Sequence, residues 1–153
     1  MKNKNYLQFA LMMAVSFVIM YGVMFLNADV WDHVMLSTTR TYMTILMIAP
    51  MAISMLIFMW RMYKNKVLNY VILSTSVIVF AATLTMLRQQ TLISDVQWMK
   101  AMIPHHSSAI MVSQKAHLKD PEAIKLAEDI IKAQKKEIAQ MKDMIQRLEN
   151  KKK

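Results

Sequence analysis

Long uncharged apolar runs fill the first half of the chain, and a charged, periodic pattern fills the second half. Three runs are long enough to cross a bilayer, which takes about 20 predominantly apolar residues. They cover about residues 6–26, 42–60 and 67–87. In lipid each run must be a helix, because no water is present there to satisfy the backbone. We therefore predict a membrane domain at residues 1–87. The first run is longer than the apolar core of a signal peptide, so we expect it to remain as a helix.

Charges in the short loops predict the orientation of these helices. Basic residues without any acid among them lie at the start of the chain and between the second and third runs: Lys2, Lys4, Arg61, Lys64 and Lys66. The loop at residues 27–41 instead carries Asp29, Asp32 and a single Arg40. The positive-inside rule therefore places the N-terminus in the cytoplasm. Three crossings then leave everything after Leu87 outside.

Residues 88–153 predict two helices outside the membrane, joined by a short turn. The first covers about residues 95–116. Pro104 removes one backbone donor inside it, so this helix either bends at Pro104 or begins there. Asp120 is a suitable N-cap for the second helix, and Pro121 suits its first position. The fold class is therefore all-α, with three transmembrane helices followed by a helix hairpin.

The second helix of the hairpin carries one apolar seam, which Gln134 interrupts once. Its residues recur in steps of three and four: Ile124, Ala127, Ile131, Ile138, Met141, Ile145 and Leu148. Two helices of this size bury too little apolar area to be stable alone. We therefore expect a second copy to pack against the hairpin, giving a four-helix bundle in a homodimer.

Composition adds a chemical anomaly to this architecture. The chain has 18 Met and no Cys, so a disulfide scaffold and a thiolate metal site are both excluded. Two of its 4 His are adjacent, in the segment "MKAMIPHHSSAIM" at residues 99–111. The net charge of +9 does not indicate nucleic-acid binding, because the lysines of the hairpin alternate with acids on a helix surface.

The histidine pair shares one helix face with two methionines. On a helix, His105, Met102, His106 and Met99 fall within an arc of roughly 120°. Met111 falls well away from this arc. Imidazole and thioether together form a soft ligand set that suits copper, particularly Cu(I). The alternative is packing, because Met99 and Met102 also lie where core residues would, and methionine commonly fills gaps in cores.

Two segments of the hairpin resemble a known bacterial family. "WMKAMIPHHSSAIM" and "AEDIIKAQKKEIAQM" are similar to the two motifs of the ferritin-like family catalogued as domain of unknown function 305. The first motif is matched at Met102, Ile103, His105, His106, Ala109 and Ile110. The second is matched at Ile130, Ile131, Gln134, Glu137, Ile138 and Met141. The resemblance covers about residues 96–145.

This resemblance implies a ferritin-like helical bundle and periplasmic copper binding through His and Met. It implies a bacterial inner-membrane protein with a periplasmic C-terminal domain, like the membrane-anchored members found in copper-resistance settings. Met141 becomes a further candidate ligand. Gln134 and Glu137 become candidates for contacts that support the ligands. Longer members carry the motif pair twice, whereas this chain carries it once, which favours a dimer.

The chain also departs from the family pattern. Ser107 and Ser108 stand where many members have Gln-Gly. Val112 stands where the family has a methionine two turns after the first histidine. Either Met111 substitutes for that methionine or the site is weaker.

Three functions remain open. The first is a membrane-anchored copper-binding protein that sequesters copper or delivers it to copper-handling proteins, without catalysis. The second is a copper transporter, since methionines recur along the second run: Met43, Met47, Met51, Met55 and Met59. Five residues in strict four-residue steps drift around a helix, however, so packing explains them as well. The third is an assembly scaffold in which the histidine pair has no metal role. A ferritin-type di-iron site is not expected, because Glu-x-x-His spacing is lacking.

Overall fold

The computed structural model describes residues 4–151, and every regular element in that range is helical. The elements are α1 (Lys4–Val23), the 3₁₀ helix η1 (Trp31–His33), α2 (Thr38–Phe58), α3 (Lys66–Arg88), α4 (Asp95–Lys115) and α5 (Pro121–Asn150). The prediction of an all-α fold is confirmed for these residues. Lys2, one of the basic residues used to predict the orientation, lies outside the described range.

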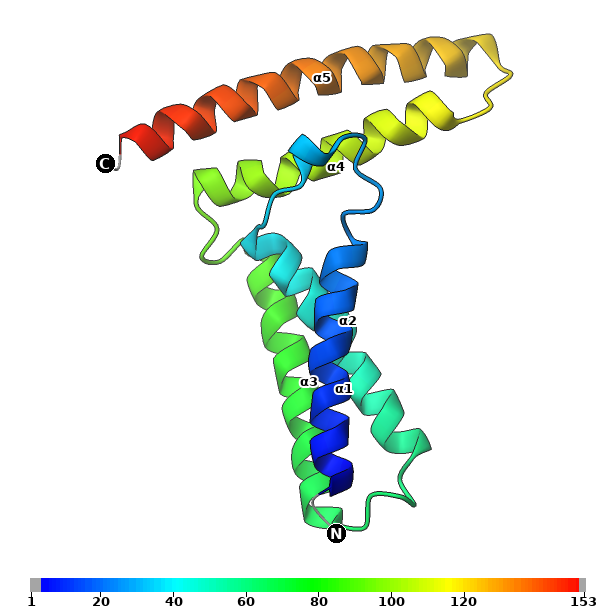
Figure 1. The fold of residues 1–153 in the computed structure, drawn as a ribbon, viewed down its shortest axis with the longest axis vertical. Helices are drawn as coiled ribbons and strands as arrows, with labels where there is room; N and C mark the ends of the chain where they lie inside the picture. Colours follow the sequence, from blue (N-terminus) through cyan, green and yellow to red (C-terminus); the bar gives the residue numbers. More distant parts are fainter. Residues whose placement is uncertain (1–3, 152–153) are drawn as a thin grey trace. The chain divides into compact units, whose positions relative to one another are not determined.

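The chain forms two compact units (Figure 1). The first contains α1, α3 and α2 from Thr39 onward. The second contains α4 and α5 together with the segment Met24–Thr38, which connects α1 to α2. The predicted domains divide the chain at residue 88. The compact units divide it near residue 92 and assign the segment 24–38 to the second unit.

In the first unit, α1, α2 and α3 are each long and apolar enough to cross a membrane. This confirms the three predicted apolar helices, with shifted ends, and their crossing of a membrane stays a prediction. α1 ends at Val23 rather than near residue 26, and the largely apolar residues 24–27 form a turn. α2 begins at Thr38 rather than near residue 42, so polar residues before the apolar run form its first turn. It also continues through Pro50.

An apolar cluster and a polar contact hold one end of the first unit together. Phe9 of α1 packs with Leu56 and Tyr63, the latter from the α2–α3 connection. Beside them, the hydroxyl of Tyr6 donates to Oδ1 of Asn69 at 2.8 Å. The side-chain amide of Asn69, which is fully buried, donates to the carbonyl of Tyr63 at 2.8 Å. Because both groups of the Asn69 amide are bonded, this buried polar residue stabilises the end of the unit.

The hairpin of the second unit begins at two side-chain caps. The Ser94 hydroxyl accepts from the backbone N–H of Gln97, so α4 begins at Asp95 and continues through Pro104. The alternative in which the helix begins at Pro104 is therefore wrong. Asp120 caps α5 by accepting from the N–H of Ala123 at 2.9 Å, and Pro121 occupies the first helical position, as predicted.

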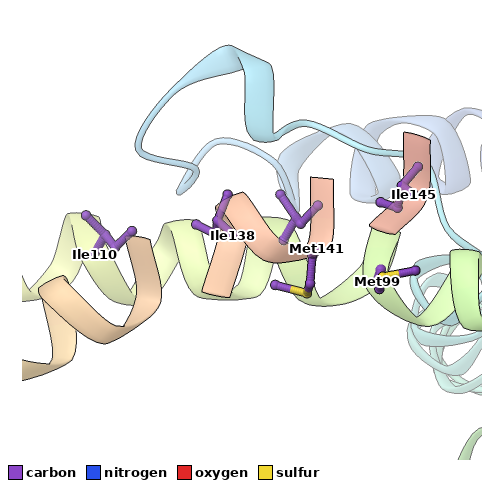
Figure 2. Packing of buried hydrophobic residues seen from close by; sticks show 6 residues of the cluster. Met99, Ile110, Ile138, Met141 and Ile145 are labelled. Atoms are coloured by element: carbon purple, nitrogen blue, oxygen red, sulfur yellow. The ribbon is translucent and has the colours of Figure 1, made fainter. Parts of the chain in front are cut away.

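α4 and α5 pack side by side through the predicted seam (Figure 1). Their buried cluster contains Met99, Ile103, Ile110, Ile138, Met141 and Ile145, most of which are labelled in Figure 2. Met35, from the segment 24–38, packs against the same cluster. The segment 24–38 therefore covers part of the apolar surface of the hairpin. The prediction that two helices alone bury too little apolar area did not include this segment. The four-helix bundle in a dimer stays a prediction.

Candidate metal site

His106 is the one member of the histidine pair that the hairpin buries. Its side chain comes from the middle of α4 and is only 8% exposed. Its Nε2 atom lies 2.8 Å from Oε2 of Glu137 on α5. An ionised carboxylate can only accept a hydrogen bond, so the proton between these atoms belongs to Nε2. In the neutral ring, Nδ1 then carries the free lone pair.

Residues 4–151 offer that lone pair no hydrogen-bond partner. The Nδ1 atom of His106 is buried and lacks a hydrogen-bond partner among the described residues. The same holds for Oε1 of Gln134, one helical turn before Glu137 on α5. A buried acceptor left unsatisfied costs about 1–3 kcal/mol. Both atoms can accept a hydrogen bond or donate a lone pair to a cation, which is the chemistry that a metal site requires.

The other predicted ligands lie in different surroundings. His105 is exposed, and its ring centroid lies 6.0 Å from that of His106 with the planes inclined by 64°. Met102 is half-buried at the edge of the apolar cluster. Met99 and Met141 are 3% and 4% exposed and lie among isoleucines (Figure 2). Their packing accounts for their position, and their role as ligands stays a prediction.

Met111 is half-buried, and its role also stays a prediction. Of the two predicted supporting residues, Glu137 contacts His106 directly. Within residues 4–151, no three His, Asp or Glu side chains gather into a group that could hold a metal ion. Among the predicted residues, the structure brings His106 and Glu137 together, and Met102 lies one helical turn before His106 on α4.

Sequence reasoning missed that the segment 24–38 docks beside this site. The hydroxyl of Ser107, which is fully buried, accepts from the backbone N–H of Asp29 at 2.8 Å. The same oxygen lies 2.8 Å from Nδ1 of His33. Ser108 Oγ accepts from the side-chain amide of Asn27 at 2.8 Å. The two serines that depart from the family pattern therefore hold this segment against α4.

Charges reinforce the docked segment. Asp32 forms an ion pair with Lys142 of α5. The hydrogen bond from Lys142 and its positive charge lower the pKa of the Asp32 carboxyl. Burial, and then the charge of Lys142, lower the pKa of the His33 imidazole. His33 and Lys142 line a pocket of about 240 Å³ with Lys135, Ile138 and Ala139. The lowered pKa of the His33 imidazole favours its neutral form near pH 7.

Comparison with known proteins identifies relatives of uncharacterised function. Residues 76–145 match the family described as Domain of unknown function (DUF305), a range that includes the histidine pair and most of α5. An uncharacterized protein of Acanthamoeba polyphaga mimivirus is 34% identical over 146 residues, which cover 92% of this chain and 94% of that protein. The similarity thus extends over the apolar helices as well as the hairpin. No solved structure matches the chain.

Proposed function

The chain belongs to the family of domain of unknown function 305, and on that premise we propose that it is a membrane-anchored protein that binds copper outside the cytoplasm. Cu(I) is the favoured ion. His106 and Met102 are its principal ligands, and copper is cargo that the protein sequesters or delivers. The observation that carries this proposal is the buried His106 ring, whose Nε2 contacts Glu137 and whose Nδ1 is unpartnered among the described residues.

The chemistry of the donors supports copper over harder ions. A metal-binding histidine usually donates its other ring N–H to a carboxylate, which fixes the tautomer and makes the ring a stronger donor. Glu137 holds His106 in this way. Met102 lies one helical turn before His106, so its thioether can reach the same ion. Imidazole and thioether are ligands that Cu(I) prefers, whereas magnesium and calcium prefer oxygen.

Contacts within the second unit support the proposed topology. The segment 24–38 follows α1, and the hairpin follows α3, so two candidate spans separate them along the chain. An even number of crossings returns the chain to the same side of a membrane. The hydrogen bonds from this segment to Ser107 and Ser108 agree with that requirement. We propose a bacterial inner membrane, with the N-terminus in the cytoplasm and the hairpin in the periplasm.

The transport alternative has less support from the membrane helices. Met55 and Met59 of the second span region pack against the apolar cluster around Leu56, together with Met13 of α1. Apolar packing is the ordinary use of methionine in such a position.

A competition titration tests the proposed function. The full chain in detergent is titrated with Cu(I) in the presence of a chelator of known affinity, beside His106→Ala and the control His117→Ala. His117 is exposed in the connection between α4 and α5, outside the helices that carry the site. We expect His106→Ala to weaken binding by at least about 10- to 100-fold and His117→Ala to leave it unchanged. Equal affinity in all three proteins would refute the assignment of His106.

A further inference from the structure

The segment 24–38 carries large apolar side chains that the rest of its unit leaves exposed. Trp31 is 84% exposed, Leu26 is 75% exposed and Val30 is 45% exposed. Together with Phe25 and Val34, these three residues line one pocket of about 230 Å³. Tryptophan is highly buried on average in folded proteins, and exposed apolar side chains that gather at one place mark an interaction surface. The segment therefore presents a surface that receives a partner.

Other residues of the same segment bind the hairpin. The backbone N–H of Asp29 donates to Ser107, and the Asp32 carboxylate pairs with Lys142. Met35 packs against the apolar cluster between α4 and α5. The side chains of Leu26, Val30 and Trp31 have no part in these hydrogen bonds and this ion pair, since they offer no carboxylate, amide or hydroxyl group. The segment thus holds the hairpin with one set of residues and leaves another set uncovered.

The ends of the segment select a lipid bilayer as the partner. α1 ends at Val23 and α2 begins at Thr38, and both helices are long and apolar enough to cross a membrane. In the proposed topology, both ends of the segment are therefore held at the outer membrane surface. Tryptophan is enriched at this level in membrane proteins, because its ring is apolar and its N–H group is polar. Trp31 has this position in the chain.

The charge of the segment indicates how it would bind lipid. Residues 24–38 contain two aspartates and no lysine or arginine, so attraction to anionic lipids does not contribute. Asp32 is already paired with Lys142. Asp29 also lines the pocket, and shallow insertion of the apolar side chains, by about 5–10 Å, leaves its carboxylate among hydrated headgroups. Burial of apolar surface is therefore the source of affinity, and a zwitterionic lipid is sufficient.

We propose that the segment 24–38 inserts Leu26, Val30 and Trp31 into the outer surface of the bilayer and thereby fixes the hairpin to that surface. The hairpin is then joined to lipid through Ser107 and Lys142, in addition to its chain connection from α3. This inference rests on the membrane anchoring in the proposed function. It adds that the hairpin with the candidate copper site is held at the lipid surface.

Fluorescence of the full chain in phosphatidylcholine vesicles tests the insertion. The chain has three tryptophans, so Trp60→Phe/Trp98→Phe leaves Trp31 as the one fluorescent indole. A lipid with a nitroxide near its headgroup quenches from the membrane, and acrylamide quenches from water. The matched control, Trp31→Phe/Trp98→Phe, keeps Trp60, which directly follows the candidate span α2. Flotation with the vesicles reports anchoring, and circular dichroism checks the helix content of each protein.

We expect the lipid nitroxide to reduce the emission of Trp31 by at least about twofold, with or without added phosphatidylglycerol, because the ring lies at the headgroup level. Quenching of Trp31 by acrylamide alone, in a protein that floats and whose Trp60 the lipid nitroxide quenches, would overturn the insertion and leave the anchoring standing. Quenching that requires phosphatidylglycerol would overturn apolar insertion as its cause. A protein that does not float would overturn both the insertion and the anchoring.

A second variant keeps the test independent of the tryptophan substitutions. The chain has no cysteine, so Leu26→Cys carries a nitroxide label at one position, and wild type is the control that takes no label. We expect paramagnetic relaxation of this label in vesicles to respond more to oxygen, which concentrates in lipid, than to a nickel chelate, which stays in water. A label that responds mainly to the nickel chelate would overturn the proposal.

Discussion

One buried hydroxyl group takes part in two of the contacts that hold the segment 24–38, so Ser107→Ala gives a sharp prediction. Ser107 is fully buried and its oxygen serves both the backbone N–H of Asp29 and the imidazole of His33, each at 2.8 Å. A typical hydrogen bond contributes about 1 kcal/mol to stability. Loss of both bonds therefore costs about 2 kcal/mol, which raises the fraction of molecules with a detached segment by about 30-fold.

Hydrogen exchange of peptides from residues 24–38 measures this detachment, with the protein in detergent. The matched control is Ser108→Ala, which removes one hydrogen bond, between Ser108 and Asn27, from an exposed site. We expect exchange in this segment to accelerate far more in Ser107→Ala than in Ser108→Ala, while α1 and α3 remain unchanged. Equal protection of the segment in the two variants would refute the reasoning.

Three further predictions concern pH, the support of the ligand and the core. The lowered pKa of His33 makes the unfolded chain the better proton acceptor, so stability is complete above the ordinary histidine pKa of 6.5 and is lost as pH falls below it. Thermal unfolding at pH 7.5 and 5.5 should show this loss in wild type and a smaller one in His33→Asn. Glu137→Gln should weaken Cu(I) binding by about 10- to 100-fold without changing helix content, as chelator competition would reveal. Ile103→Ala, at a fully buried position, should cost about 2–5 kcal/mol in denaturant unfolding, whereas Val112→Ala, at an exposed position, should cost less than about 0.5 kcal/mol.

Local signals in the sequence predicted the elements of the structure well. Asp120 and Pro121 begin α5 because a cap and a pre-set backbone angle act within one turn of the chain. The seam from Ile124 to Leu148 predicted the face that α5 packs on α4, because helical periodicity needs no knowledge of the partner. The ends of α1 and α2 were less predictable, because residue polarity alone does not mark where a helix ends. The apolar residues after Val23 leave the helix, whereas the polar residues from Thr38 belong to it.

Contacts between distant segments could not be predicted from the pattern alone. The contact of His33 with Ser107 joins residues 74 positions apart. The two serines gave one signal, because small hydroxyl residues replaced the family's usual pair, but nothing in the sequence identified their partner. The pairing of His106 with Glu137 was partly foreseeable, because Glu137 matched the family motif. Its geometry required the register of α4 against α5.

X-ray absorption at the copper edge of the loaded full-length protein tests the central claim most directly. This measurement identifies the atoms bound to the metal, and comparison with His106→Ala and Met102→Leu assigns them. The account predicts imidazole nitrogen and thioether sulfur around copper in wild type. It also predicts that the imidazole contribution falls in the first variant and the sulfur contribution in the second. A wild-type spectrum with oxygen and nitrogen neighbours and no sulfur, unchanged in both variants, would contradict it.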